Sequence, residues 1–312
     1  MILCIGTTPA AQRVMVFRSL AIDVVNRAVQ TLDGFAGKSI NVAKVLHALG
    51  EQPLATGFLG GDRGEQLRQH FDDRGIEHEF VTVRARTRQC ITVIDEGAGT
   101  HTELVEESRA VEPGDFEKLV AIIRRRIGQA RAVIMSGTVA PGGPTALYRL
   151  CTELAHEKGI PAVADAAGVP LMSALEARPS LVKPNHPELA ATAGRALPDD
   201  AAVMQAMRQL SERGAERVVV TAGKNAALAF DGKTFWRICP PRVTALNPIG
   251  SGDSFTAALT LRLLRGDDLG ECCRWGSAAG AANALTWMAG EVRKEDVEEL
   301  AGRVSVERID SI

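Results

Sequence analysis

The 312-residue sequence predicts an α/β fold in which a doubly wound, mostly parallel sheet is flanked by helices. Short apolar segments alternate with helical patterns along most of the chain, which is the order of parallel strands joined by crossover helices. Several of these segments, such as Arg131 to Ser136 (RAVIMS), are apolar nearly throughout. A strand of that kind suits a sheet that helices cover on both faces.

The expected strands begin with Ile2-Leu3-Cys4-Ile5 and continue with residues 131–136, 161–165 and 217–221. Apolar residues at three- and four-residue spacing predict the helices between them, over residues 39–49, 62–74, 115–127, 144–158 and 199–213, several closed by glycine. Two stretches, about 14–29 and 78–106, have the pattern of short alternating strands with glycine turns. They are expected either to pair into a small separate sheet or to add a hairpin to the core sheet.

Composition excludes several classes of protein. With 36 basic and 38 acidic residues the formal net charge is −2, and aromatic residues are only 4%, so neither charge nor base stacking supports nucleic-acid binding. The six cysteines contain no C-x-x-C pair, which argues against structural zinc and a disulfide framework. No segment approaches the roughly 20 apolar residues of a membrane span, and the N-terminus lacks a signal-peptide pattern. The expectation is a cytoplasmic protein that binds no membrane.

The strongest local motif is Gly250-Ser251-Gly252-Asp253, which opens a helical pattern that ends near Gly266. The two glycines let the backbone turn tightly, and the start of a helix leaves amide N–H groups unpaired, so together they form an anion hole suited to a phosphoryl group. Asp253 would then stand beside that group as a general base. The same four residues also suit a glycine turn with an acidic residue near a helix N-terminus, which favours stability alone.

A second glycine-containing element, Gly34 to Leu46, opens the first long helix. It is not a P-loop, because the Walker pattern that ends in Gly37-Lys38-Ser39 requires glycine at position 32, where this chain has Leu32. No complete G-x-G-x-x-G pattern follows a predicted strand, which argues against a dinucleotide-dependent oxidoreductase.

Six motifs, in order over nearly the whole chain, resemble the PfkB, or ribokinase-like, family of sugar kinases. They are Gly37-Lys-Ser-Ile-Asn-Val-Ala43, Ser136-Gly-Thr-Val-Ala-Pro-Gly142, Asp165-Ala-Ala-Gly168, Lys183-Pro-Asn-His-Pro-Glu-Leu189, Val220-Thr-Ala-Gly223 and Gly250-Ser-Gly-Asp253. Ile-Asn-Val after Gly-Lys, with Val25-Asn26-Arg27 and Thr87-Arg88, is most similar to the branch that phosphorylates already-phosphorylated sugars, the 1-phosphofructokinase and tagatose-6-phosphate kinase type. The resemblance implies a single ribokinase-like domain, residues 1–312, with a β-sheet lid inserted at about 9–33 and 78–108.

The resemblance also implies that Asp253 is the catalytic base of an ATP-dependent kinase, and that the amides of Gly250, Ser251 and Gly252 hold the γ-phosphoryl group. Phosphoryl transfer needs mainly positioning and charge neutralisation, so a base, an anion hole and a metal form a sufficient set. Asn185 and Glu188 match a family element associated with Mg²⁺, expected to act through water; by themselves they fit a helix capping box at least as well. The ATP-binding residues that the resemblance implies are Lys183, Asn185, Thr221, Gly223, Lys224 and Asn283.

The acceptor is expected to bind to the N-terminal half. Lys38 and Arg88 are candidates for holding a phosphate already on the sugar, since Arg can grip two oxygens and Lys acts as a point charge. Three residues depart from the family pattern here: Gln12 replaces an aspartate that grips acceptor hydroxyls, and Ala36 and Ser39 replace glycines that leave the sugar site more room. The expected substrate-binding residues are Gln12, Arg27, Gly37, Lys38, Asn41 and Arg88, with Arg27 reaching this cleft or that of a neighbouring subunit.

The resemblance thus predicts a carbohydrate kinase that uses ATP and Mg²⁺ and acts on a phosphorylated hexose of the fructose 1-phosphate or tagatose 6-phosphate type. The alternatives are a kinase of an unphosphorylated sugar or a nucleoside, and a non-catalytic sensor of sugar phosphate or nucleotide with the same fold. Two copies are expected to form a homodimer, because paired small sheets cover each other's exposed faces and edges.

Overall fold

The computed structural model describes residues 1–309, and its core is a single large sheet. The strands of this sheet are β1 (Ile2–Ile5), β4 (Pro53–Thr56), β6 (Glu77–His78), β10 (Ala132–Ser136), β11 (Ala162–Asp165), β12 (Leu181–Val182), β13 (Val218–Ala222), β14 (Asn225–Phe230), β15 (Phe235–Cys239) and β16 (Ser305–Ile309). Their order is β16-β15-β14-β13-β12-β11-β10-β1-β4-β6. Every neighbouring pair from β13 to β6 is parallel, whereas β13 to β16 pair antiparallel. The predicted doubly wound, mostly parallel sheet is confirmed.

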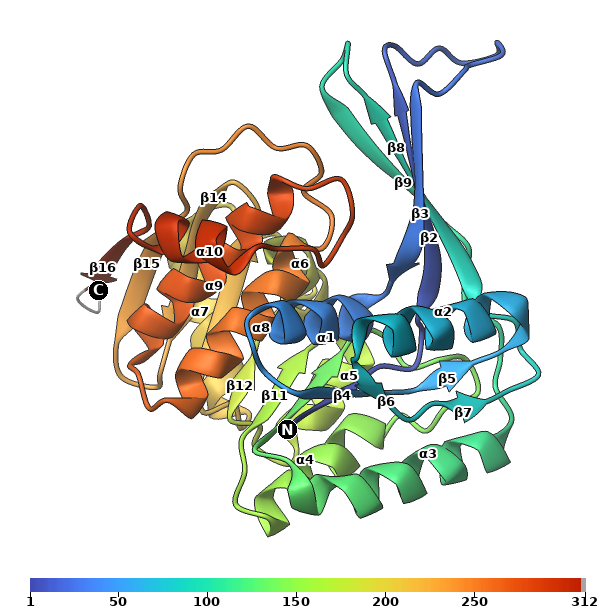
Figure 1. Cartoon of the computed structure of the whole chain (residues 1–312). Coiled ribbons are helices and arrows are strands. Elements are labelled where there is room, and N and C mark those ends of the chain that lie inside the picture. The colour runs from blue at the N-terminus through green and yellow to red at the C-terminus, as the bar shows by residue number, and fades with distance from the viewer. Residues whose placement is uncertain (310–312) are drawn as a thin grey trace.

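Helices cover both faces of the core sheet (Figure 1). They are α1 (Lys38–Ala48), α2 (Gly61–Arg74), α3 (Pro113–Arg126), α4 (Leu147–Glu157), α5 (Gly168–Leu175), α6 (His186–Ala193), α7 (Asp200–Glu212), α8 (Ser251–Leu264), α9 (Leu269–Ala284) and α10 (Lys294–Ala301), with a 3₁₀ turn at Ile127–Gln129. Two buried apolar clusters result: α3, α4, α5 and α7 pack on one face, and α1, α2, α8, α9 and α10 on the other. The five helices predicted from spacing are all present. Among residues 1–309 no helix has the length and apolar character needed to cross a membrane.

A small second sheet projects from the core (Figure 1). It consists of β2 (Ala10–Phe17), β3 (Gln30–Ala36), β8 (Arg88–Asp95) and β9 (Thr100–Val105), in the order β3-β2-β8-β9. The two insertions meet where β2 and β8 pair in parallel. The separate sheet is therefore confirmed over the alternative of an added hairpin.

The predicted start of the second insertion, at residue 78, is wrong. His78 pairs with Ala55 of β4 at the edge of the core sheet, and β7 (Val81–Thr82) pairs with β5 (Phe58–Leu59) in a separate two-stranded sheet. The insertion begins only at β8. Alternating apolar residues occur in both places, so their period carries no information about which neighbouring strand will bond to them.

The small sheet joins the core at the carboxyl end of β1, which leads directly into β2, while β3 leads into α1. Its apolar face, formed by Val14, Val16 and Ile94, packs on Trp287 and Met288, which follow α9. The sheet thus contacts both the N-terminal and the C-terminal parts of the core at the edge where parallel strands end and ligands of α/β folds bind.

Candidate active site

The start of α8 forms a tight turn at Gly250. Gly250 has φ 87°, and a Cβ atom at this position would lie 2.8 Å from the Cβ of Ala289, so both the conformation and the space require glycine. The amides of Gly252 and Asp253 have no backbone acceptor among the described residues, whereas the amide of Ser251 donates to the Pro248 carbonyl (3.2 Å). The predicted anion hole thus has its glycine turn and helix start, with the Ser251 amide already engaged.

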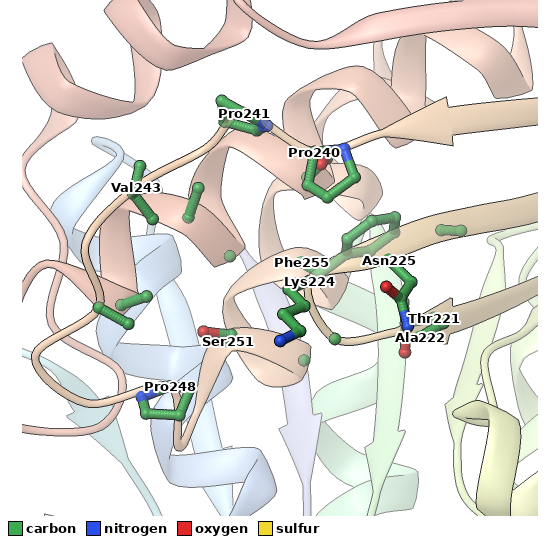
Figure 2. Close-up of a pocket in the computed structure, with 18 of the residues that line it drawn as sticks. Thr221, Ala222, Lys224, Asn225, Pro240, Pro241, Val243, Pro248, Ser251 and Phe255 are labelled. Atoms are coloured by element: carbon green, nitrogen blue, oxygen red, sulfur yellow. The ribbon is translucent and has the colours of Figure 1, made fainter. Parts of the chain in front are cut away.

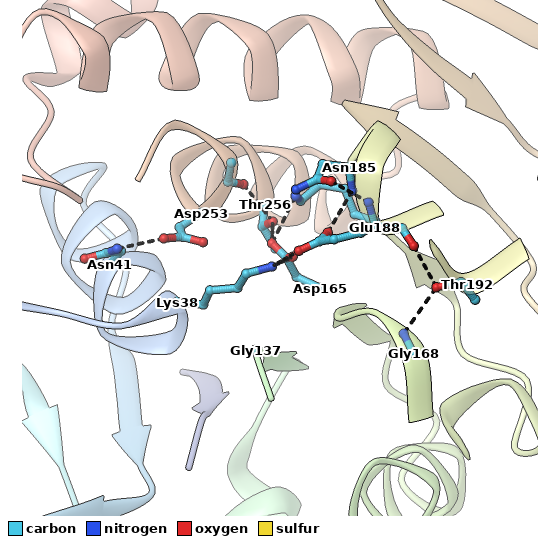
Figure 3. A network of polar contacts seen from close by, with 12 residues as sticks. Lys38, Asn41, Gly137, Asp165, Gly168, Asn185, Glu188, Thr192, Asp253 and Thr256 are labelled. Carbon is cyan, nitrogen blue, oxygen red and sulfur yellow. Dashed lines mark hydrogen bonds and ion pairs between the residues drawn. The ribbon is translucent and has the colours of Figure 1, made fainter. Parts of the chain in front are cut away.

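Asp253 lies in the first turn of α8 with only 7% of its surface exposed. Asn41 Nδ2, from α1, donates to its Oδ2 atom at 2.7 Å (Figure 3). Burial and, to a smaller extent, the nearby carboxylate of Asp165 raise the pKa of Asp253 to about 7, against the opposing effect of Lys38. A carboxyl group with such a pKa changes its protonation state near neutral pH, which suits a proton acceptor.

Asp165, at the end of β11, is the centre of a buried charge cluster. Its Oδ1 pairs with Lys38 Nζ at 2.9 Å and its Oδ2 with Lys183 Nζ at 3.0 Å, and Thr256 Oγ1 donates to Oδ2 at 2.6 Å (Figure 3). Burial alone would raise the pKa of this carboxyl, but Lys183 and Lys38 outweigh it and hold the pKa well below its usual range. Asp165 therefore stays charged and fixes both ammonium groups.

Lys183 also lies close to the anion hole, since a Cβ atom on Gly252 would lie 3.6 Å from Lys183 Nζ. The cluster thus brings one ammonium group beside the glycine turn at the positive end of a helix. In the sequence, Asp165 stands out only as part of a family motif, and no pattern indicates Thr256. An aspartate that closes an otherwise apolar strand was the available signal for Asp165.

Asn185 and Glu188 form the capping box at the start of α6. Asn185 Oδ1 accepts from the Glu188 amide and Glu188 Oε2 accepts from the Asn185 amide, both at 2.8 Å. The remaining Glu188 oxygen, Oε1, pairs with Lys38 Nζ at 3.1 Å. The capping alternative is thus what the structure shows for Asn185, while Glu188 serves both the helix and the charge cluster.

A cavity of about 600 Å³ opens beside the glycine turn (Figure 2). Thr221, Gly223 and Lys224, three of the residues that the resemblance implies for ATP, line it together with Ser251 and Phe255. Its volume is in the range of small-molecule sites, roughly 300–1,000 Å³. The cavity lies between the turn that joins β13 to β14 and the start of α8, and Gly252 is among the residues that line it.

Asn283 does not contact this cavity, contrary to the prediction of an adenine contact. It is fully buried; its Nδ2 donates to the Ile249 carbonyl (2.9 Å), and its Oδ1 accepts from the Gly290 amide (2.7 Å). These bonds use both polar atoms of the side chain. Asn283 therefore supports the Gly250 turn from behind.

The residues predicted for the acceptor are only partly brought together. Gln12 on β2 is 1% exposed; its Nε2 donates to Thr92 Oγ1 (3.3 Å), while its Oε1 has no partner among the described residues. Arg88, at the start of β8, donates to the Thr8 carbonyl (3.1 Å) and has no carboxylate within 4.0 Å in the described part of the chain. Arg27 is exposed in the loop between β2 and β3, at the far end of the small sheet.

The two added side chains near this site, Ala36 and Ser39, are both buried. Ser39 occupies space that Gly6 leaves free, because a Cβ atom on Gly6 would lie 2.2 Å from Ser39 Oγ. Gly37 has φ 112°, and a Cβ there would approach the Pro9 Cα to 3.0 Å, so it is required as glycine between β3 and α1. Ser39 is thus accommodated against Gly6, just after β1.

Comparisons with known proteins agree with this geometry. The family model described as pfkB family carbohydrate kinase matches residues 1–291. A putative phosphofructokinase from Staphylococcus aureus is 26% identical over the full length of both chains, with a TM-score of 0.80. Phosphofructokinase-2 from Escherichia coli, solved in complex with fructose-6-phosphate, is 27% identical over 96% of this chain and 98% of that chain, with a TM-score of 0.85.

A possible 1-phosphofructokinase from Thermotoga maritima, 22% identical over 99% of each chain, shares the fold with a TM-score of 0.89. The likeness to solved structures thus extends over nearly the whole chain, including the small sheet. Because the family model matches residues 1–291, the chain belongs to the pfkB family of carbohydrate kinases and is an ATP-dependent sugar kinase.

Proposed function

We propose that this kinase transfers the γ-phosphoryl group of ATP to a hydroxyl group of a hexose phosphate. The observation that carries the proposal is Asp253, a buried carboxyl group with a pKa of about 7, which shares the first turn of α8 with the glycine turn. A proton acceptor and a site for a phosphoryl group are thus next to each other on one helix.

In this proposal Asp253 accepts the proton of the acceptor hydroxyl while the oxygen of that hydroxyl forms a bond to the γ-phosphorus. The bond between that phosphorus and the bridging oxygen of ATP breaks, and ADP leaves with the electron pair. The charge that develops on the transferred group is stabilised by the amides of Gly252 and Asp253 and by Lys183. Lys38, which lies between Asp165 and Glu188, favours the ionised form of Asp253 and so opposes the rise in its pKa.

The residues also suit Mg²⁺ held mainly by nucleotide phosphates and water. Across residues 1–309 no group of three or more His, Cys, Asp and Glu side chains could enclose a metal ion, and the Asn185 oxygen is committed to its cap. Glu188 is the partly exposed carboxylate that would face the ion through water. When bound, Mg²⁺ neutralises phosphate charge; the side chains themselves orient the acceptor and hold the proton.

Arg88 supports an acceptor that already carries a phosphate. Arg88 is half-buried, and because no carboxylate of the described residues lies within 4.0 Å of it, its remaining donors can bind a phosphate. This role, predicted for Lys38 and Arg88 together, falls to Arg88 because Lys38 is paired with two carboxylates. The similar Escherichia coli enzyme was solved in complex with fructose-6-phosphate, which belongs to this acceptor class.

The proposal is tested by measuring ADP release from Mg·ATP with free sugars, hexose phosphates and nucleosides as acceptors. We expect kcat/KM for the best hexose phosphate to exceed that for the corresponding free sugar by about tenfold or more, since one charge-assisted contact is worth about 1.5–3 kcal/mol. Asp253→Asn protein, purified in parallel, controls for contaminating kinases. A preference for a free sugar or a nucleoside would reject the hexose phosphate, and no acceptor-dependent release would favour the sensor.

We also propose that the small sheet is a lid that pairs with the lid of a second copy. Its exposed residues include several large apolar ones, with Ile22 95%, Val25 81% and Leu104 54% exposed. A second copy would cover these side chains and bring Arg27 toward a neighbouring site. Light scattering at micromolar concentration should give a dimer, Val25→Asp with Leu104→Asp a monomer, and Val169→Asp, on α5, an unchanged dimer. A monomeric wild type contradicts the proposal.

A further inference from the structure

The segment from Trp287 to Glu291, between α9 and α10, lies behind two parts of the site that are distant in sequence. A Cβ atom on Gly250 would lie 2.8 Å from the Ala289 Cβ, so the glycine turn packs tightly against this segment. A Cβ atom on Gly290 would lie 2.7 Å from the Asn41 Cα, so the segment also packs directly against Asn41, which donates to Asp253, and limits where Asn41 can lie. A shift of this segment therefore moves the anion hole and the partner of Asp253 together.

The same segment contacts the small sheet. Trp287 and Met288 pack on its apolar face, and a Cβ atom on Gly34 would lie 2.6 Å from the Met288 Cε. The lid and the phosphoryl-transfer machinery thus share one five-residue support.

Lys44 holds this support in place. Its side chain extends from α1 and is 4% exposed. Its Nζ donates to the carbonyl of Ala289 (2.6 Å) and to that of Phe35 at the end of β3 (3.2 Å), and it pairs with Glu291 Oε1 (3.1 Å). One ammonium group therefore joins α1, the lid strand and the segment behind Gly250.

Burying an ammonium group in a protein core costs free energy, because the group loses its hydration. Burial lowers the pKa of Lys44, an effect that Glu291 opposes, and an apolar side chain of similar length would avoid the loss of hydration. An apolar side chain, however, could not make the two directional hydrogen bonds that Lys44 donates to the backbone carbonyls of Phe35 and Ala289. Lys38, Asn41 and Lys44 are also three residues apart, so α1 presents all three to the site from one face.

We propose that Lys44 is a positioning residue for phosphoryl transfer: its ammonium group fixes the segment 287–291, and through it the Gly250 turn and the Asn41–Asp253 hydrogen bond. Lys44 does not line the ATP cavity, so its loss should misplace the reacting groups without weakening ATP binding. The inference applies to any acceptor of this kinase.

The test compares Lys44→Met with Arg74→Met, using the acceptor that the wild type turns over fastest. Arg74 Nη1 pairs with the same Glu291 oxygen (2.8 Å) but is 40% exposed and has no bond to Ala289 or Phe35. For Lys44→Met we expect kcat to fall by about 10–100-fold, the effect of a misplacement of roughly 1 Å, with the KM for ATP unchanged. Arg74→Met should keep the wild-type kcat.

Amide hydrogen exchange gives a second readout that needs no acceptor. Lys44→Met should accelerate exchange in residues 287–291 and 250–254, whereas Arg74→Met should leave it unchanged. If Lys44→Met does not fold, Lys44→Gln, which keeps an amide donor, takes its place in both measurements. A folded Lys44 variant with a kcat within twofold of wild type, or an equal loss of kcat in Arg74→Met, overturns the proposal. A failed acceptor assignment would alter neither the exchange pattern nor the contrast between the two variants.

Discussion

The two ends of the proposed site differ in how completely their polar side chains are paired. At the phosphoryl-transfer end, Asp165 has three partners at 2.6–3.0 Å, and Asp253 accepts from Asn41 at 2.7 Å. At the acceptor end, Gln12 Oε1 and Asn41 Oδ1 are buried without a partner, and Arg88 has no carboxylate within 4.0 Å, among the described residues.

This difference separates chemistry from specificity. A buried oxygen atom that accepts no hydrogen bond costs about 1–3 kcal/mol of stability unless a ligand donates to it. The hydrogen bonding at the acceptor end is therefore completed only when the sugar binds. The transfer end is already organised, as a group that must stabilise developing charge should be. We therefore expect specificity to depend on side chains of the small sheet and of α1, and catalysis on the start of α8.

The largest effect should come from the transfer end. Asp253→Asn preserves the shape of the side chain and removes the proton acceptor, so kcat should fall by about 10²–10⁴-fold. Asp268→Asn is the matched control, because Asp268 caps α9 outside the site and Asn caps a helix equally well. Steady-state ADP release measures both. Near-normal turnover of Asp253→Asn would assign the base to another residue and remove the basis of the contrast between the two ends.

A smaller and more selective effect is expected at the acceptor end. Arg88→Met should raise the KM for a hexose phosphate by about 10–100-fold, the value of a charge-assisted contact, and leave the KM for ATP unchanged. Arg13→Met, on the neighbouring strand β2, is the control, since Arg13 is already paired with Asp33 (2.6 Å) and exposed. If both kinetic constants for ATP and acceptor change together in Arg88→Met, the two ends are not separable in this way.

The transfer end was also the more predictable from sequence. Glycine at 250 is required by local geometry, so a short motif indicates it, and the helix spacings likewise depend on neighbours three or four residues away. The hub at Asp165 depends on Lys38, 127 residues away, and on Thr256, 91 residues away. Periodicity carries no information about such pairs.

The remaining differences have the same physical origin. His78 was assigned to the small sheet because its segment alternates, but β4 of the core supplies its partner. The resemblance implies an adenine contact for Asn283, whereas its amide bonds to Ile249, just before the glycine turn, and to Gly290 in the segment that packs against that turn. A side chain that supports a site and one that lines it have similar sequence signals, and the direction of the side chain distinguishes them.

Ionisation of the buried Asp253 at the transfer end should lower the free energy of unfolding near neutral pH. The pKa of Asp253 is raised to about 7 in the folded chain, above the unfolded value of about 3.9, so the native state binds the proton more tightly. Stability from this group is present below about pH 4 and is lost as the pH rises toward 7. Asp253→Asn should therefore be more stable than wild type at pH 8, on the order of 4 kcal/mol for a shift of about three pKa units. Urea unfolding at pH 8 and pH 5 should show the gain shrinking at the lower pH; an equal gain at both values would contradict the raised pKa.

The smallest effect concerns Asn41, which belongs to both ends of the site: its Nδ2 bonds to Asp253, while its Oδ1 is one of the acceptors without a partner. Activity requires ionised Asp253, so kcat/KM should rise with pH to a plateau, with an apparent pKa of about 7. The Asn41 bond lowers the pKa of Asp253, so Asn41→Ala should move this rise to higher pH by up to about one unit, the value of one bond to a charged group.

The same substitution should raise the KM for the acceptor, because the Oδ1 atom that would accept from a sugar hydroxyl is lost. Asn26→Ala, in the exposed loop of the small sheet, controls for loss of an amide that bonds only to local backbone. The two changes have separate causes: the shift of the pH profile follows from loss of the Nδ2 donor, and the rise in KM follows from loss of the Oδ1 acceptor. A shift of the pH profile without a change in KM would confine Asn41 to the transfer end, and a change in KM alone would confine it to the acceptor end.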